Sequence, residues 1–287
     1  MTLVVDAIVL GVFGAAPLVL AAVGFTLIYY LNGFINVAYG ENLTVGAYTA
    51  VTLNTILGFN FYLTMIPSAL MAGVVSVATY LLVFRPAMRR GVGVTELIIL
   101  SVGLSFFIRF AIRLVFGVEL YLFDAGSPSF IDILGIGVTD VQLTALGLVL
   151  LTVVVLYLFI FRTSYGQQMR ALAGNGDLAR VSGIDPSRVT ILIWFIAGIA
   201  GGLAGIFYGV FSYVNADVGW NLILIVIMIS ILGRVGSVRG ALVAGVAAGI
   251  ITAFLTQIAQ PLYAQVVLLI LFIVVLKMTR KSAAARG

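Results

Sequence analysis

The stretch INVAYGENL, residues Ile35–Leu43, interrupts a chain that is strongly apolar on both sides. It contains polar or small residues where a membrane helix would run on without a break: Asn36, Gly40, Glu41 and Asn42. An ionisable group at membrane depth costs at least about 2.5–3.5 kcal/mol. Non-helical backbone at that depth is tolerated only where protein buries it or water contacts it. The stretch therefore predicts a helix break inside a membrane protein, with Glu41 facing a cavity or a partner.

The composition around this stretch indicates a protein that lies in lipid. The chain has 287 residues, of which 63% are apolar and 9% are charged, and its mean hydropathy is +1.25. Soluble domains are about half apolar and about a quarter charged. We therefore predict an all-α polytopic membrane protein with the lipid membrane as its surroundings. Residues 1–287 are expected to form a single transmembrane domain, because no long stretch has the composition of a soluble domain.

Cysteine and histidine are both absent. Their absence excludes disulfides, thiolate nucleophiles, imidazole bases and the usual transition-metal ligands. We expect no catalytic residue, no metal and no cofactor. The net charge of +5 could suggest nucleic acid, but basic residues beside membrane spans more often report orientation, so no nucleic-acid partner is expected.

Apolar runs separated by polar breaks predict membrane spans near 7–31, 43–57, 62–84, 94–116, 141–161, 190–212, 220–233, 241–257 and 263–277. Several are shorter than the roughly 20 residues that cross a bilayer as a helix. We therefore expect about eight or nine crossings, some of them broken or re-entrant.

The basic residues predict the orientation of the chain. With alternating crossings, every Lys and Arg except Arg109 and Arg113 falls on one side, including the residues of the C-terminal tail. The opposite loops contain Glu119, Asp124 and other acids. The positive-inside rule then predicts a multi-pass protein of the cell membrane with a cytoplasmic C-terminus; nine crossings would place the N-terminus outside.

A second break resembles the first. FINVAYGENL and YVNADVGWNL align without gaps, and they pair Asn36 with Asn215, Gly40 with Gly219, Asn42 with Asn221 and Leu43 with Leu222. Inverted repeats in transporters bring such breaks together near the bilayer midplane, although four identities can also arise by chance. If the breaks are related, the translocation pathway is predicted to be lined by Asn36, Tyr39, Gly40, Glu41, Asn42, Asn215, Gly219 and Asn221.

Other charged residues have simpler interpretations. Glu41 could favour the start of the following helix through the helix dipole, line the pathway, or do both. Arg109 and Arg113 are four residues apart, so they share one face of the 94–116 span. Snorkelling toward Glu119 and Asp124 is favoured for them over anion selection in a pore.

The longest basic loop, residues 162–189, contains signals of ordered structure. Tyr165–Ala173 are predicted to be helical, Asp177 to cap a short helix that Gly183 ends, and Asp185 to cap the next span. Leu178 and Val181 would share one face of the short helix, with Arg180 on another. The residues alone leave two interpretations open, a docking element for a partner and a helix that touches lipid headgroups.

Four segments carry a resemblance to a known family: GFTLIYYLNGFINVAYGENLTVGAY, RPAMRRG, MRALAGNGDLARVSGID and GRVGSVRGALVAG. Over about Gly24–Lys277 the chain resembles permease subunits of branched-chain amino acid ABC importers, a group that includes urea permeases. Relatives often have histidine where this chain has Tyr39, and the tail LKMTRKSAAARG also departs from the family pattern.

The resemblance implies an importer with two permease subunits, a copy or a relative of each other, two cytoplasmic ATP-binding subunits and an extracytoplasmic solute-binding protein. It implies that the loop 162–189 couples the permease to an ATPase through Arg170, Asn175, Asp177, Leu178, Arg180, Val181 and Gly183.

The expected solute is small and polar, a branched-chain or other amino acid, with urea or an amide as the alternative. The chain would not be an enzyme, because it has no nucleotide-binding motif and its partners would hydrolyse ATP. Two other classes are weighed against this one. An ion-coupled transporter would use Glu41 and Glu96 as proton carriers, and an intramembrane enzyme would need paired acid and base groups.

Overall fold

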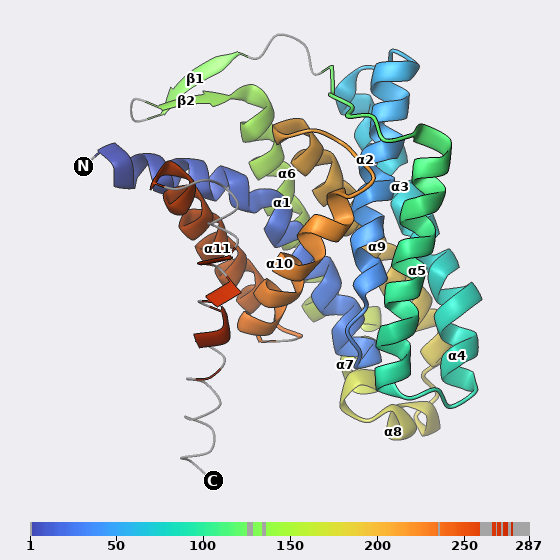
Figure 1. Ribbon diagram of the computed structural model, residues 1–287. Coiled ribbons are helices and arrows are strands. Elements are labelled where there is room, and N and C mark those ends of the chain that lie inside the picture. Colours follow the sequence, from blue (N-terminus) through green and yellow to red (C-terminus); the bar gives the residue numbers. More distant parts are fainter. Residues whose placement is uncertain are drawn as a thin grey trace.

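A computed structural model describes residues 2–124, 129–133, 136–234 and 236–258, together with 266–267, 269–270, 272–274 and 277. These residues form a bundle of α-helices with one β-hairpin at one end (Figure 1). The helices are α1 (Thr2–Asn32), α2 (Gly40–Val51), α3 (Phe61–Thr79), α4 (Arg85–Arg89), α5 (Val94–Phe116), α6 (Asp140–Arg162), α7 (Ser164–Gly174), α8 (Gly176–Val181), α9 (Pro186–Phe211), α10 (Val218–Leu232) and α11 (Val238–Ile258).

Shorter elements complete the described chain. A 3-10 turn, η1 (Val37–Tyr39), precedes α2, and π-helical turns η2 (Thr52–Ile56) and η3 (Tyr80–Phe84) extend α2 and α3. The strands β1 (Phe130–Ile133) and β2 (Ile136–Thr139) pair antiparallel, with Phe130 opposite Thr139.

Six helical segments among the described residues are long and apolar enough to cross a bilayer: Ala7–Asn32, Phe61–Arg89, Val94–Phe116, Asp140–Arg162, Pro186–Phe211 and Val238–Ile258. The predicted spans 220–233 and 43–57 correspond to the shorter apolar helix α10 and to α2 with its π-helical extension. The predicted span 263–277 lies mostly outside the described residues. The all-α membrane fold is confirmed, and the number of about eight or nine crossings stays a prediction.

Small residues allow the central helices to pack closely. α1 packs along α11 and α9, and α9 also packs against α2 and α3. A Cβ atom added at Gly249 of α11 would lie 2.4 Å from Ala15 of α1, and one added at Gly205 of α9 would lie 1.9 Å from the carbonyl oxygen of Leu43. These helices therefore approach one another backbone to backbone, as small-residue faces in membrane proteins permit.

Both predicted helix breaks are present. The first lies between α1 and α2, where the chain reverses at Gly33 with φ of 73° and returns through η1. The second lies between α9, which ends at Phe211, and α10, which begins at Val218. In Figure 1, α2 runs toward the hairpin end of the bundle and α10 runs toward the opposite end.

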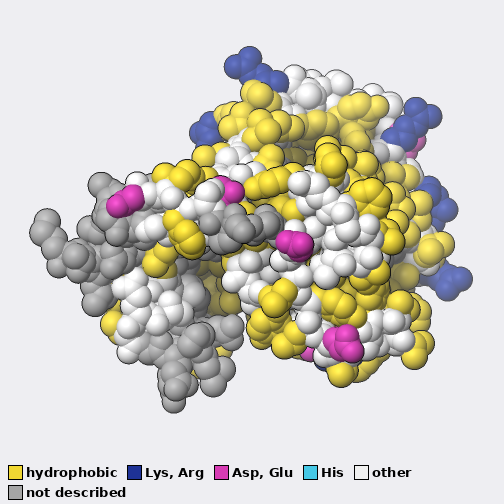
Figure 2. Space-filling model, turned by 90° about the horizontal axis from the view of Figure 1, so that it is seen from above, with side chains coloured by type: hydrophobic (Ala, Val, Ile, Leu, Met, Phe, Trp, Pro, Cys, Tyr) yellow, Lys and Arg dark blue, Asp and Glu magenta, His cyan; other side chains and the backbone are white. Residues whose placement is uncertain are grey.

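Charge is divided between the two ends of the bundle. α4, α7 and α8, with their arginines, lie at the end opposite the hairpin (Figure 1). Figure 2 shows the hairpin end, where scattered acidic side chains lie on a largely apolar surface and basic side chains project only at the periphery. This separation agrees with the pattern on which the orientation was predicted, and the identity of the cytoplasmic side stays a prediction.

Candidate functional site

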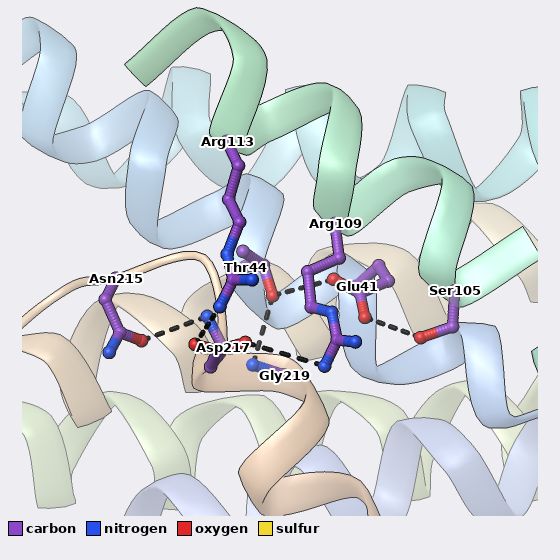
Figure 3. A network of polar contacts seen from close by, with 8 residues as sticks. All are labelled: Glu41, Thr44, Ser105, Arg109, Arg113, Asn215, Asp217 and Gly219. Carbon is purple, nitrogen blue, oxygen red and sulfur yellow. Dashed lines mark hydrogen bonds and ion pairs between the residues drawn. The ribbon is translucent and has the colours of Figure 1, made fainter. Parts of the chain in front are cut away.

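Polar side chains gather where the beginnings of α2 and α10 meet the second half of α5, from its middle to its last turn (Figure 3). Apolar helices surround them, so each polar group needs a partner within the protein. The members of this cluster are Glu41, Thr44, Ser105, Arg109, Arg113, Asn215, Asp217 and Gly219.

Glu41 is the most deeply buried ionisable residue of the cluster, with 1% of its surface exposed. Its Oε1 accepts a hydrogen bond of 2.6 Å from the hydroxyl of Ser105, and its Oε2 accepts one of 3.1 Å from Thr44. Thr44 Oγ1 in turn accepts a bond of 3.0 Å from the backbone N–H of Gly219. The carboxylate therefore joins α2 to α5 directly and to α10 through Thr44.

The two glycines that the sequence alignment pairs lie in contact. A Cβ atom added at Gly219 would lie 2.0 Å from the carbonyl oxygen of Gly40, and one added at Gly40 would lie 2.7 Å from the carbonyl oxygen of Gly219. No side chain fits between the two backbones. Corresponding residues near a two-fold axis meet in this way, so the contact supports the proposal of an inverted repeat.

Asp217, at the end of the second break, lies between two arginines of α5. Its Oδ2 is 2.5 Å from Nη2 of Arg113, and its Oδ1 is 3.5 Å from Nη1 of Arg109. The prediction that these arginines reach toward Glu119 and Asp124 is wrong, because Asp217 is the acid that meets both. Sequence reasoning missed Asp217, although an acid inside the break YVNADVGWNL was a usable signal.

Aromatic rings surround the Arg109 guanidinium. Its Cζ lies 4.7 Å from the ring centre of Trp220, 4.8 Å from that of Phe106 and 5.3 Å from that of Phe110. Such cation–π contacts stabilise a desolvated arginine. Its Nε is buried and has no hydrogen-bond partner among the described residues.

The other predicted pathway residues have different surroundings. Asn36 and Asn42 are buried, and Oδ1 of Asn36 has no partner among the described residues. Tyr39 is fully buried, and its hydroxyl donates to the carbonyl of Ala197 at 3.2 Å, so it faces α9 rather than the cluster. Asn215 accepts a bond of 3.0 Å from the N–H of Asp217, and Asn221 is exposed.

α5 and the segment that follows it hold both breaks in place. The hydroxyl of Ser101 accepts a bond of 3.0 Å from the N–H of Val37 in the first break. Beyond α5, Tyr121 forms an isolated antiparallel bridge with Val214 in the second break. These backbone contacts explain why the two irregular segments keep a defined conformation at membrane depth.

The loop 162–189 folds into α7, α8 and the start of α9. The predicted helix over Tyr165–Ala173 is confirmed as part of α7. Arg170 donates a hydrogen bond to the carbonyl of Ile160 and so ties α7 to α6. Leu178 and Val181 of α8 are 64% and 87% exposed.

The caps in this loop agree with prediction except at one place. Asn175, not Asp177, caps α8, since its side chain accepts a bond of 3.0 Å from the N–H of Leu178. Asp177 lies in the first turn and pairs with Arg180 at 3.2 Å. Gly183 follows the helix with φ of 83°. The predicted cap at Asp185 is confirmed, with a bond of 2.9 Å from Ser187 N–H.

Two proteins named as branched-chain amino acid transport permeases are similar to this chain. A probable branched-chain amino acid transport permease protein, LivH, of Methanocaldococcus jannaschii is 28% identical over an alignment of 192 residues, which covers 64% of this chain and 61% of that protein. The high-affinity branched-chain amino acid transport system permease protein BraD of Pseudomonas aeruginosa is also 28% identical over 192 residues, 63% of this chain and 62% of BraD. The match therefore spans less than two thirds of each relative.

A family model covers nearly the whole chain. Residues 7–276 match the model described as branched-chain amino acid transport system / permease component. The matched range contains both helix breaks, the polar cluster and the loop 162–189. The chain belongs to the family of permease components of branched-chain amino acid transport systems.

Proposed function

We propose that this chain is the transmembrane permease subunit of an ABC importer for a small polar solute, a branched-chain or other amino acid. Its membership in the permease family and the names of its two relatives support a transport role. The proposed complex contains ATP-binding subunits that hydrolyse ATP, a second permease subunit and an extracytoplasmic solute-binding protein. The arginine-rich end, with the C-terminus, faces the cytoplasm in this proposal.

The observation that carries the proposal is the exposed apolar pair on α8. Leu178 and Val181 project from a short capped helix at the arginine-rich end, where an aqueous compartment would contact them. Exposed apolar side chains on an ordered element favour a docking surface for a protein partner. An ATP-binding subunit would occupy this surface.

The helix next to α8 provides a route for coupling. α7 packs against α1, α6 and α9, and its Met169 is 1% exposed. A movement of α8 driven by the ATPases would therefore reach α1, which precedes the first break, and α9, which precedes the second. Alternating access would follow if such a movement separated the beginnings of α2 and α10.

Reconstitution tests the function directly. The chain, expressed with its partners, is purified, the partners are identified, and the complex is placed in liposomes with ATP. We expect ATP-dependent uptake of an amino acid that the solute-binding protein delivers. Uptake of urea or an amide alone would favour the urea-type alternative, and uptake driven by a proton gradient without ATP would contradict the proposal.

The docking surface has its own test. Replacing Leu178 and Val181 together by serine removes apolar surface that contributes about 1.5–3 kcal/mol per side chain when it is buried, so ATPase binding should weaken at least about a hundredfold. Co-purification of the ATPases measures this change, and the melting temperature of the permease should stay constant. Ser182→Ala, at the end of the same helix, is the matched control and should keep its ATPases. Unchanged co-purification and uptake in the double variant would show that α8 is not the docking element.

A further inference from the structure

The polar cluster has an exposed side near the end of α5 and the start of α10. The side chains of Arg113 and Asp217 are 32% and 29% exposed. At about 1.5 Å per residue, Arg113 lies about 28 Å along α5 from Val94. Asn221, which is also exposed, lies about 16 Å along α10 from Leu232, near the middle of a hydrocarbon core about 30 Å thick.

The amide of Asn221, at about the middle of the core, avoids lipid, because polar residues in membrane spans face the protein interior or water. Arg113, in the last turn of α5, lies near the boundary of the core, where its charged end can reach water. The surface between α5 and α10 therefore faces an aqueous space rather than the bilayer. In a permease that space is the translocation pathway, closed on its other side by the second permease subunit.

Arg109 is incompletely hydrogen-bonded within the cluster. Arg109 and Arg113 share the single carboxylate of Asp217, and the contact of Arg109 is the longer one at 3.5 Å. Arg109 Nε has no partner among the described residues, and the residue is only 8% exposed. Both carboxylate oxygens of Glu41 already accept hydroxyl bonds. A solute carboxylate beside Asp217 would give the two guanidinium groups further charged acceptors.

We propose that Arg109, Arg113 and Asp217 form a binding site for a zwitterionic α-amino acid in the pathway. The carboxylate of the solute would accept hydrogen bonds from the two guanidinium groups, and its ammonium would donate to Asp217. The partly exposed Arg113–Asp217 pair presents opposite charges side by side, which is the pattern that a zwitterion complements. This inference rests on the proposed function and deepens it by naming the residues that select the solute.

The surface beside the ion pair is suited to an apolar side chain. Phe110 is 53% exposed and Phe106 is 37% exposed, and Trp220 lies against Arg109 between α5 and α10. A branched aliphatic side chain would bury apolar area on these rings. A neutral solute such as urea lacks both charges, so it would give neither a charged acceptor to the arginines nor a charged donor to Asp217.

The test uses the assembled transporter in nanodiscs, without ATP and without the solute-binding protein. Binding of radiolabelled leucine is measured with three competitors: unlabelled leucine, 4-methylpentanoate, which lacks the ammonium, and isopentylamine, which lacks the carboxylate. We expect saturable binding, with each single-charge competitor at least about tenfold weaker than leucine, since each loses one charge-assisted contact.

Charge-removing variants separate recognition from a structural role. Asp217→Asn should weaken leucine binding at least about tenfold and make 4-methylpentanoate compete as well as leucine, because the contact with the ammonium is gone. Arg113→Gln should also weaken leucine binding at least about tenfold, and it should make isopentylamine compete as well as leucine, because a contact with the carboxylate is gone. Asp217→Glu keeps the charge and should restore the preference for leucine. Glu119→Gln removes an exposed carboxylate from the same end of α5 and should change neither binding nor ranking.

The outcomes keep the two proposals apart. If uptake falls in Asp217→Asn and Arg113→Gln but leucine binding and the competitor ranking stay as in the wild type, the ion pair is structural. The zwitterion site is then wrong, while the importer function stands. If the wild-type complex takes up no amino acid, the proposed function fails and the site assignment fails with it. If Asp217→Asn does not assemble, the ranking of the competitors in Arg113→Gln and Asp217→Glu still tests the site. A wild-type ranking in Arg113→Gln would contradict it.

Discussion

At the scale of single residues, Glu41 joins three segments of the chain. It lies in the first turn of α2, where the helix dipole favours a carboxylate, but its oxygens bond to hydroxyls and not to the helix N–H groups. It therefore fixes the position of α2 against α5 and does not cap its own helix. Whether it also contacts the solute stays a prediction.

Two substitutions at Glu41 should have different effects on stability. Glu41→Gln can donate to Ser105 and accept from Thr44, so its melting temperature should stay near that of the wild type. Glu41→Leu leaves two buried hydroxyls without an acceptor, at about 1–3 kcal/mol each, and should melt several degrees lower. Thermal unfolding in detergent measures both. A Leu variant as stable as the wild type would show that these hydrogen bonds do not hold α2. Uptake by Glu41→Gln is a separate readout, and a wild-type rate would restrict Glu41 to a structural role.

The partner of Arg109 and Arg113 could not be predicted from the sequence. The spacing of Arg109 and Arg113 correctly placed them on one face of a helix. Their partner, Asp217, is 104 positions beyond Arg113, and nothing in local periodicity connects residues so far apart. The nearer acids Glu119 and Asp124 were chosen because proximity in the chain was the only available guide.

At the scale of elements, the two helix breaks form one unit. Gly40 and Gly219 bring the backbones of α2 and α10 together, and Thr44 donates to Glu41 while it accepts from the N–H of Gly219. The sequence predicted each break from its polar residues, because such residues are costly in lipid wherever they lie. It could not predict which residues bond across the breaks, since those contacts depend on how the helices pack.

The glycine contact predicts a large effect from a single methyl group. Gly219→Ala places a Cβ 2.0 Å from the carbonyl oxygen of Gly40, so α2 and α10 must separate. We expect a loss of about 1–3 kcal/mol in stability, as for other overpacked sites, together with reduced uptake. Gly147→Ala in α6 is the matched control, because nothing lies within 4 Å of its added Cβ, and it should be neutral or slightly stabilising. Equal melting temperatures for the two variants would contradict the contact.

The exact start of α8 could not be predicted from the sequence. Asparagine and aspartate are both good N-cap residues, so Asn175 and Asp177 compete for the role. The chain at Asn175 is extended, with φ of −152° and ψ of 101°, and this places the helix start two residues earlier than predicted. Propensity alone does not separate positions so close together.

At the scale of the whole molecule, composition and charge were enough to predict the fold class. The apolar content required many membrane helices, and the described residues contain six of full length. The central position of α1 and α9 was not predictable, because it depends on small-residue faces that match only in three dimensions.

The orientation of the molecule can be tested with single cysteines, since the chain contains none. Ser129→Cys at the hairpin end should react with an impermeant thiol reagent added to intact cells. Ser182→Cys, beside α8, should react only after permeabilisation when the permease is expressed without its partners. Both positions are exposed, so a difference reports the side of the membrane. The reverse pattern would overturn the orientation.

The packing of α1 against α11 has a consequence for biosynthesis. The ribosome delivers α1 to the membrane long before α11 exists, yet the glycine at position 249 meets its partner surface on α1 only in the finished chain. Throughout translation the small-residue face of the first helix is therefore covered by lipid or by other membrane proteins. Closure of the bundle must wait until α11 has left the translocon, and chains that stop before Val238 expose this face to membrane quality control.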